Sequence, residues 1–347
     1  MDQVILATGG YDHSIRFWAA YNGQCQRTLQ HQESQVNAME ITPDRQLLAV
    51  AGFQHIRMYD IPGSNNQNPV STYEGVGKNV TAVGFNEENR WMYSSGEDGT
   101  VRIWDLRVRN TPQKLSVANC PINCVTLHPN QIELLAGDQN GCIHVWDIRN
   151  ERKEIHAADS DVSIQHISIE PEGNWLSAVD NRGACYVYRL KFHDQRTTCL
   201  KKRLRLPAHR KYALKCKFSP DSTLLVTTSA DSTAKVWRTA DLLPLSQEAA
   251  GVDRDPDPGN LSSLQGAGSG TSSWPISDNL TPLVTLKTQN QRWVWDVAFS
   301  MDSQYVITAS SDNNARLWNI NTGENIREYS GHQKAITALA FSDGVPV

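Results

Sequence analysis

The sequence lacks long hydrophobic runs and a strong charge of either sign, and each absence excludes a class of protein. No apolar stretch in the 347 residues approaches the roughly 20 residues that a membrane-spanning helix needs. The formal net charge is −4, which gives no global field that would attract nucleic acid or an anionic membrane. We therefore expect no nucleic-acid partner and no membrane insertion.

Cysteine is sparse, and its pattern does not indicate disulfides. The chain has seven cysteines, an odd number, and several of them occupy alternating positions of predicted strands. This usage is typical of reduced thiols in a cytosolic or nuclear compartment. The start of the chain, with Asp2, has neither the basic region nor the long apolar core of a signal peptide. We expect a cytoplasmic location.

Motifs for catalysis, metals and cofactors are also missing. The run Gly75-Val76-Gly77-Lys78 lacks both the first glycine and the hydroxyl residue of a phosphate-binding loop. His209 and His332 have no further ligands at zinc-site spacing, and Cys120 and Cys124 lack a partner pair. No Ser/His/Asp or paired-carboxylate set stands apart from the repeat pattern of the chain. The sequence predicts a protein that is not an enzyme and has no metal or cofactor.

The sequence does contain a repeat, which is most complete between Pro207 and Arg238. Three short runs of alternating polar and apolar residues are separated by turns, at Ser219-Pro220-Asp221 and again at Asp231. The third run ends on Trp237, six residues after that aspartate. Alternation with period two between closely spaced turns indicates short antiparallel strands.

The aromatic residue that ends the third run recurs seven times. The seven positions are Trp18, Tyr59, Trp104, Trp146, Tyr188, Trp237 and Trp318. Their spacings are 41, 45, 42, 42, 49 and 81 residues. A period of roughly 40–45 residues with four strands per unit is the pattern of the WD-repeat β-propeller. We predict an all-β fold, a single seven-bladed propeller over residues 1–347.

The one long spacing has a separate explanation in the segment Asp241–Thr281. Sixteen of its 41 residues are Gly, Ser or Pro, and it has six acidic residues against one basic residue. Such a composition cannot build a core and favours disorder. We predict a disordered insert between the third and fourth strands of blade six, on the bottom face of the ring.

The first repeat unit lacks its innermost strand, and the segment Lys334–Ser342 supplies one from the other end of the chain. We therefore predict a ring closed by strands from both termini, which leaves no open sheet edge. In a complete unit a His, a Ser or Thr, the turn Asp and the Trp are expected to share buried hydrogen bonds. The predicted sets are His332, Asp12 and Trp18 across the termini, and His209, Asp231 and Trp237 within blade six.

A propeller without catalytic groups works as a binding platform, so the residues around its top opening are the candidate site. Each innermost strand ends in an apolar residue, and counting back from it gives two rim positions per blade. Six positions back are Gln35, Asn79, Pro121, Ser163, Tyr212, Trp293 and Ala335. Four positions back are Asn37, Thr81, Asn123, Gln165, Leu214, Trp295 and Thr337.

Five of these rim residues are the predicted partner-binding residues: Gln35, Asn37, Tyr212, Trp293 and Trp295. Exposed Trp is enriched at binding hot spots because it buries a large area at low entropic cost. The amides beside it add oriented hydrogen bonds. The alternative is that one of the two Trp residues packs between blades.

Five runs carry a closer resemblance than the repeat alone: His31–Ala38, Gln54–Asp60, Arg90–Tyr93, Ala118–His128 and Gly331–Ala335. They resemble one particular WD-repeat family, the G-protein-β-subunit-like proteins, which are subunits shared by both TOR kinase complexes. The resemblance spans the propeller, and the unusual Gln54-His55 turn is more specific than a generic repeat. The long insert Asp241–Thr281 departs from the usual family pattern.

The resemblance implies a monomeric propeller that docks on the C-lobe of the TOR kinase domain and supports it without catalysis. It also implies recruitment to lysosomal or other endomembrane surfaces through the complex. A substrate adaptor of a ubiquitin ligase or chromatin complex is the main alternative, because the fold alone does not fix the partner. A true G-protein β subunit would need an N-terminal coiled-coil helix, and a propeller hydrolase is a more distant alternative.

Overall fold

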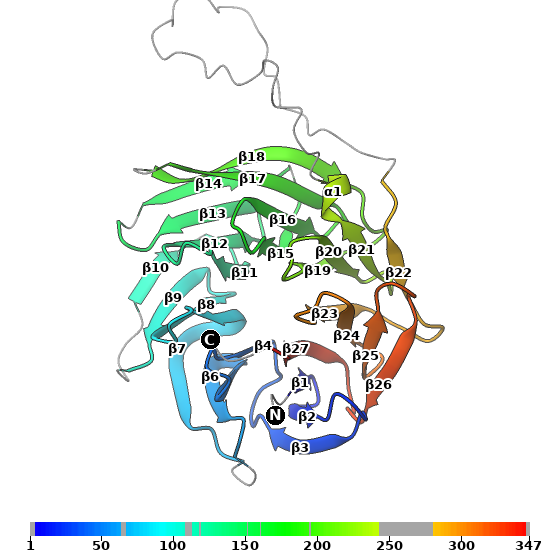
Figure 1. The fold of residues 1–347 in the computed structure, drawn as a ribbon. Coiled ribbons are helices and arrows are strands. Elements are labelled where there is room, and N and C mark those ends of the chain that lie inside the picture. Colours follow the sequence, from blue (N-terminus) through cyan, green and yellow to red (C-terminus); the bar gives the residue numbers. More distant parts are fainter. Residues whose placement is uncertain are drawn as a thin grey trace, which may run out of the picture.

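A ring of seven four-stranded blades surrounds a central channel (Figure 1). The computed structural model describes residues 4–63, 67–107, 113–117, 119–150, 152–159, 161–193, 196–242 and 280–344. Every strand pair is antiparallel, and within each blade the strands follow one another outward from the channel. The predicted all-β, seven-bladed WD-repeat propeller is confirmed.

The innermost strand of each blade lines the channel. From the channel outward, blade one contains β27 (Ile336–Ser342), β1 (Ile5–Gly10), β2 (Ser14–Trp18) and β3 (Cys25–Gln30), and blade two contains β4 (Ala38–Ile41), β5 (Leu47–Ala51), β6 (Phe53–Asp60) and the start of β7 (Ser71–Phe85). Blade three contains the end of β7, β8 (Trp91–Gly96), β9 (Thr100–Asp105) and β10 (Gln113–Val117), and blade four contains β11 (Ile122–Leu127), β12 (Glu133–Asp138), β13 (Cys142–Asp147) and β14 (Lys153–Ala157). Blade five contains β15 (Ile164–Ile169), β16 (Trp175–Asp180), β17 (Cys185–His193) and β18 (Arg196–Leu206). Blade six contains β19 (Ala213–Phe218), β20 (Leu224–Ser229), β21 (Ala234–Arg238) and β22 (Val284–Leu286), and blade seven contains β23 (Val294–Phe299), β24 (Tyr305–Ser310), β25 (Asn314–Asn319) and β26 (Asn325–Ser330).

One strand belongs to two blades. The start of β7 pairs with β6, for example Tyr73 with Ile56, and its end pairs with β8, for example Val83 with Ser94. Blades two and three therefore form a continuous seven-stranded sheet. In the other blades the chain leaves the outer strand before it enters the next blade.

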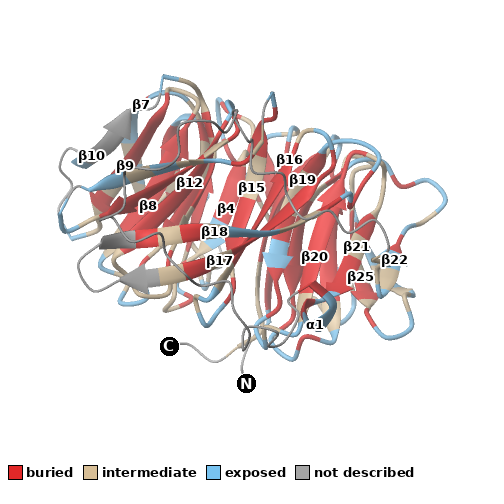
Figure 2. Cartoon of the chain, turned by 90° about the horizontal axis from the view of Figure 1, so that it is seen from above, coloured by how far each residue is buried: buried red, intermediate tan, exposed pale blue. Residues whose placement is uncertain are grey.

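The ring is closed by β27, which pairs with β1 in a register that runs from Ile5–Ser342 to Gly10–Ile336. The two ends of the chain consequently lie on the same face, together with the short helix α1 (Thr239–Leu242) (Figure 2). This arrangement confirms the predicted closure by strands from both termini.

The core lies between neighbouring blades. One buried cluster joins Trp18 of blade one to Ile307 and Tyr329 of blade seven. Another joins Leu29 of blade one to Tyr59 of blade two. The second strand of each blade is buried along most of its length, for example β8, β12, β16 and β20 in Figure 2. Each blade therefore completes its hydrophobic burial only when both neighbours are present.

The predicted insert Asp241–Thr281 includes residues at both ends that belong to the folded blade. Asp241 and Leu242 belong to α1, and the Leu242 side chain is buried in the cluster that also contains Trp237 and the partly buried Leu280. The segment between them joins β21 to β22, the third and fourth strands of blade six. Residues 243–279 lie outside the described part of the chain, so the disorder prediction stays a prediction.

Candidate partner-binding rim

We call the predicted rim residues six positions back the outer set. Most of them accept an equivalent backbone hydrogen bond in their own blade. In six blades, the amide that follows the second strand donates to the carbonyl of the residue six positions before the end of the innermost strand. The donor–acceptor pairs are Tyr11–Ala335, Glu97–Asn79, Gln139–Pro121, Asn181–Ser163, Ala230–Tyr212 and Ser311–Trp293, at 2.9 to 3.1 Å. Because this bond recurs, the residues occupy equivalent places around one opening of the ring.

The predicted rim residues four positions back, which we call the inner set, lie at β-bulges in six of the seven blades. The register between the first and second strands shifts by one residue in six blades, and the extra residue is the one four positions back. These residues are Thr81, Asn123, Gln165, Leu214, Trp295 and Thr337. A bulge re-aims a side chain and bends its strand. Blade two has no such shift, and Asn37 there precedes β4 and donates its amide to Ala51 O.

Polar residues at the bulges bind the next blade. Thr81 Oγ1 donates to Ile122 O at 2.8 Å, and Asn123 Nδ2 donates to Ile164 O at 2.7 Å. Thr337 Oγ1 donates to Val36 O at 2.5 Å across the ring closure. These bonds join successive blades at the rim, so a bulge with a polar residue has a structural role.

Trp295 occupies a bulge without making such a bond. Its indole Nε1 is buried and has no hydrogen-bond partner among the residues that the structure describes. The ring packs 5.6 Å from that of Trp293, and Tyr11 of blade one meets it edge to face at 6.4 Å. Trp295 is therefore half-buried between blades seven and one, which is the packing role that the sequence left open for one of the two Trp residues.

The exposed aromatic surface of the rim comes from three other side chains. Trp293 is 41 % exposed, Tyr11 41 % and Tyr212 52 %. Trp293 and Tyr212 lie at equivalent positions of adjacent blades, and Tyr11 lies in the turn after β1. We call Tyr11, Tyr212, Trp293 and Trp295 the aromatic arc. The sequence identified three of its members and missed Tyr11, because a turn aromatic carries no periodic signal.

The amides of blade two form a second part of the rim. Gln35 Nε2 and Asn37 Nδ2 both approach Asn79 Oδ1, at 3.5 and 3.4 Å, and Asn79 Nδ2 donates to Glu97 Oε2 at 3.0 Å. Gln35 and Asn37 are half-buried. The structure thus brings these two predicted residues together in blade two. The aromatic arc comes from blades six, seven and one, so the two groups lie in adjacent parts of the rim.

Blade two replaces the usual polar set with a histidine pair. His31 Nδ1 lies 3.1 Å from the Tyr59 hydroxyl, and His31 Nε2 lies 3.2 Å from His55 Nε2. Burial, reinforced by the nearby His55 and Arg57, lowers the pKa of His31 to about 3, so the ring is neutral. Gln54, next to this pair, has φ 64° and donates to Gly77 O. The unusual Gln54-His55 turn thus has a structural basis.

The two predicted structural sets are present. Trp18 Nε1 donates to Thr8 Oγ1 at 2.7 Å, His332 Nε2 lies 2.8 Å from the same hydroxyl, and His332 Nδ1 lies 2.8 Å from Asp12 Oδ2. In blade six, Trp237 Nε1 and His209 Nε2 bind Thr227 Oγ1 at 3.0 and 2.9 Å, and His209 Nδ1 lies 3.0 Å from Asp231 Oδ2. The Ser/Thr expected in each set is Thr8 in blade one and Thr227 in blade six, positions that the sequence analysis did not assign.

The turn aspartates of these sets are held ionised. Burial alone would raise the pKa of Asp12, but hydrogen bonds and the charge interaction with His332 outweigh it and hold that pKa well below its usual range. The same balance of burial against His209 and Thr233 lowers the pKa of Asp231. Because these polar side chains already hydrogen-bond to one another within the blades, they are not available to bind a ligand.

Comparison with known proteins decides the family. The WD domain, G-beta repeat, matches residues 23–60, 67–105, 111–147, 197–238 and 280–319. The cattle (Bos taurus) protein named "Target of rapamycin complex subunit LST8" is 50 % identical over 347 residues, which cover 99 % of this chain and 96 % of the relative. The chain belongs to the LST8 family.

Other members of the LST8 family are more distant but similar along the chain. The "Protein LST8 homolog" of Drosophila melanogaster is 43 % identical over 99 % of this chain and 97 % of its own length. The Saccharomyces cerevisiae protein named "Target of rapamycin complex subunit LST8" is 41 % identical over 67 % of this chain and 77 % of its own length. The family resemblance inferred from the sequence is confirmed.

For this LST8-family chain, the described residues contain no group of three or more His, Cys, Asp or Glu that could hold a metal ion. No helix in the described ranges has the length and apolar character needed to cross a bilayer. Burial raises the pKa of the Cys124 and Cys216 thiols to about 12, so neither is poised as a nucleophile. The relatives that establish the family are named as target of rapamycin complex subunits, and their names state no catalytic activity.

Proposed function

We propose that the protein is a non-catalytic scaffold subunit of TOR complex 1 and TOR complex 2. It binds and stabilises the TOR kinase domain and so supports nutrient and growth-factor signalling to cell growth. The observation that carries this proposal is the 50 % identity, over 99 % of the chain, to a protein named as a target of rapamycin complex subunit. Identity over the whole length favours the same role, because no blade is left unmatched.

The proposal assigns the contact with the C-lobe of the kinase domain to the rim. The aromatic arc offers exposed area at Trp293, Tyr11 and Tyr212, and the half-buried Trp295 supports it from behind. Aromatic area flanked by the amides of Gln35 and Asn37 is the mixture expected in the core of an interface.

The proposal includes a location. The protein acts in the cytoplasm and reaches lysosomal or other endomembrane surfaces through the complex, as a monomeric propeller within the larger assembly. Imaging of a tagged protein in cells with and without the kinase tests this, because recruitment through the complex requires that the endomembrane signal disappear with the kinase.

Capture of purified kinase domain by immobilised propeller tests the docking surface. Trp293→Ala should weaken binding by about 2 kcal/mol or more, roughly thirtyfold, if Trp293 is a hot spot. Gln35→Glu should also weaken it, because it brings a carboxylate to the Asn79 Oδ1 acceptor. The matched control is Tyr21→Ala, since Tyr21 is 76 % exposed in the turn between β2 and β3, at the opposite end of the strands.

Melting temperatures decide how the result is interpreted. Trp293→Ala and Gln35→Glu should melt near the wild type, whereas Trp295→Ala removes packing against Tyr11 and is a poorer test than the sequence alone indicated. Full kinase binding by both folded variants would show that the rim is not the docking surface. Affinity purification of the wild type tests the wider proposal, because recovery of ubiquitin-ligase or chromatin subunits in place of the kinase would favour the adaptor alternative.

A further inference from the structure

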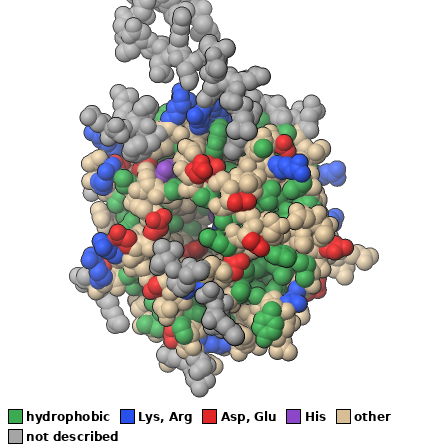
Figure 3. Space-filling model, in the orientation of Figure 1, with side chains coloured by type: hydrophobic (Ala, Val, Ile, Leu, Met, Phe, Trp, Pro, Cys, Tyr) green, Lys and Arg blue, Asp and Glu red, His purple; other side chains and the backbone are tan. Residues whose placement is uncertain are grey.

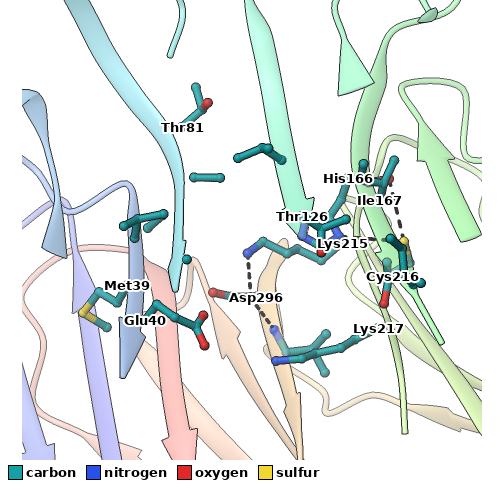
Figure 4. Close-up of a pocket in the computed structure, with 18 of the residues that line it drawn as sticks. Met39, Glu40, Thr81, Thr126, His166, Ile167, Lys215, Cys216, Lys217 and Asp296 are labelled. Carbon is teal, nitrogen blue, oxygen red and sulfur yellow. Dashed lines mark hydrogen bonds and ion pairs between the residues drawn. The ribbon is translucent and has the colours of Figure 1, made fainter. Parts of the chain in front are cut away.

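The central channel contains a cavity that the proposed docking of the rim does not use. The cavity has a volume of about 460 Å³ and is lined by the innermost strands of all seven blades. Four of its lining residues carry a formal charge, namely Glu40 on β4, Lys215 and Lys217 on β19, and Asp296 on β23. The two lysines extend from β19 toward the side of the channel that carries the two acids (Figure 4).

Two of these charges are already paired. Lys215 Nζ lies 3.1 Å from Asp296 Oδ1. Asp296 also accepts the backbone amides of Val297 and Leu339, at 2.8 and 2.9 Å. Because this carboxylate has an ammonium and two N–H donors, we expect the pair to be a fixed part of the channel wall.

The other two charges have no such partner. Within the described part of the chain, neither the Glu40 carboxylate nor the Lys217 ammonium makes a hydrogen bond or an ion pair, and both side chains are exposed to the channel. Glu40 touches channel solvent but is ringed by protein, and this enclosure raises the pKa of its carboxyl, while Lys217 and Lys215 oppose the effect. A ligand ammonium beside Glu40 would relieve that cost.

The histidine that lines the cavity, His166, adds no charge. Burial and the two nearby lysines hold the pKa of His166 well below its usual range, so its ring is neutral. His166 Nδ1 lies 3.8 Å from Cys216 Sγ, in the direction of the neighbouring blade. The four charged lining residues therefore sum to zero. A polyanion would meet two carboxylates, and a polycation would meet two ammonium groups.

We propose that the channel is a binding site for a small zwitterion, whose carboxylate binds Lys217 and whose ammonium binds Glu40. Each contact is a charge-assisted hydrogen bond, the stronger class of hydrogen bond in proteins. The cavity volume falls in the range of small-molecule sites. On the face shown in Figure 3, acidic side chains lie near the centre of the ring and most basic side chains lie at its periphery. The rim residues Thr81, Asn123 and Gln165 also line the cavity, but none of the residues proposed to contact the kinase does. The proposed site therefore uses other side chains than the proposed docking surface.

Calorimetric titration of the full chain with linear ω-amino acids tests the site. Glycine, β-alanine, 4-aminobutyrate and 6-aminohexanoate place the two charges at increasing separation, so one length should bind best. For that length, the matching monocarboxylic acid and the matching primary amine should each bind at least about tenfold more weakly. Pyrophosphate serves as the polyanion probe and should not compete.

Variants then assign the two contacts. Lys217→Met and Glu40→Gln should each weaken the best probe about tenfold or more, and Lys217→Arg should retain most of the affinity because it keeps the charge. The matched controls, Lys287→Met and Glu87→Gln, lie at exposed positions outside the channel and should change nothing.

The comparison among probes needs no variant, so misfolding of one variant does not remove the test. The proposal is overturned if no ω-amino acid binds at millimolar concentration, or if the acid without an amine binds as well as the zwitterion. Preferential binding of pyrophosphate overturns it in favour of an anion site. Unchanged affinity in both folded charge-removing variants overturns it as well.

Discussion

At the scale of single residues, the turn aspartate recurs and its partner varies. In four of the blades, an aspartate lies six positions before the tryptophan that ends the third strand, and a donor side chain lies beside it. In blade four, the corresponding aspartate is the last residue of the second strand. The pairs are Asp12–His332, Asp98–Arg102, Asp231–His209, Asp312–Arg316 and, in blade four, Asp138–His144. In blade five the donor is the Tyr186 hydroxyl, 2.8 Å from Asp180. A buried carboxylate needs a donor, but the chemistry of that donor is free to change.

Thr227→Val tests how much one complete set contributes to stability. The substitution keeps the shape of the side chain but removes the hydroxyl that binds Trp237 Nε1 and His209 Nε2. Two buried polar groups lose their partner, so the free energy of unfolding should fall by about 2–3 kcal/mol. Denaturant unfolding measures the change. Thr223→Val, at an exposed turn, is the control and should cost under about 1 kcal/mol. Equal effects of the two substitutions would contradict the role of the set.

Asp231→Asn tests the electrostatic part of the same set. Because the pKa of Asp231 is lowered in the folded state, its ionised form adds stability above the ordinary carboxyl pKa of about 4, and that contribution is lost as pH falls further. The wild type should exceed the variant by about 1.5–3 kcal/mol at pH 7, and the gap should shrink below pH 4. Unfolding at pH 7 and at pH 3 measures it. Asp161→Asn, at an exposed position, should show no such narrowing.

At the scale of elements, the strands were predictable and their irregularities were not. Turn residues and alternation locate the strands, and counting back from the closing apolar residue finds the rim, because the first strands have nearly the same length in every blade. The six bulges could not be predicted, since each depends on how two strands pair and not on one strand's sequence. The contacts of His31 with His55 and Tyr59 likewise join the residue after β3 to β6, which is another blade's strand. The continuity of β7 could not be predicted either, because Ser71–Phe85 contains glycines at 75, 77 and 84, a residue type that often marks the end of a strand.

Removal of β27 tests ring closure at this scale. Ending the chain before Lys334 takes away the inner strand of blade one and exposes β1 on the side that pairs with residues 336–342. The truncation leaves an open sheet edge and removes Ile336 and Leu339 from the buried cluster around Trp18. We therefore expect no soluble monomer. Size-exclusion chromatography and thermal melting give the readout. A chain that ends after Gly344 is the control and should behave as wild type, whereas cooperative melting of the longer truncation near the wild-type temperature would refute closure by β27.

At the scale of the whole molecule, the two faces of the ring carry different structural features. The rim gathers bulges, interblade hydrogen bonds and the aromatic arc at the starts of the inner strands. The opposite face carries both ends of the chain and α1 (Figure 2). Since α1 and Leu280 are packed in the same cluster, the segment between them leaves and re-enters blade six at one place. A change in that segment should therefore be independent of the rim.

Replacement of residues 243–279 by a short Gly/Ser link tests that independence. Leu242 and Leu280 are kept because both contribute to the cluster around Trp237, a requirement that the composition alone did not reveal. Loop-closure entropy varies slowly with length, so the free energy of unfolding should change by less than about 1 kcal/mol. Capture of the kinase domain should also stay at the wild-type level, because the rim is untouched. A control that also replaces Leu242 and Leu280 should lose stability through the exposed cluster. A large loss of stability with both leucines retained would show that the segment is part of the folded core, and a loss of kinase capture alone would place a second contact on the face opposite the rim.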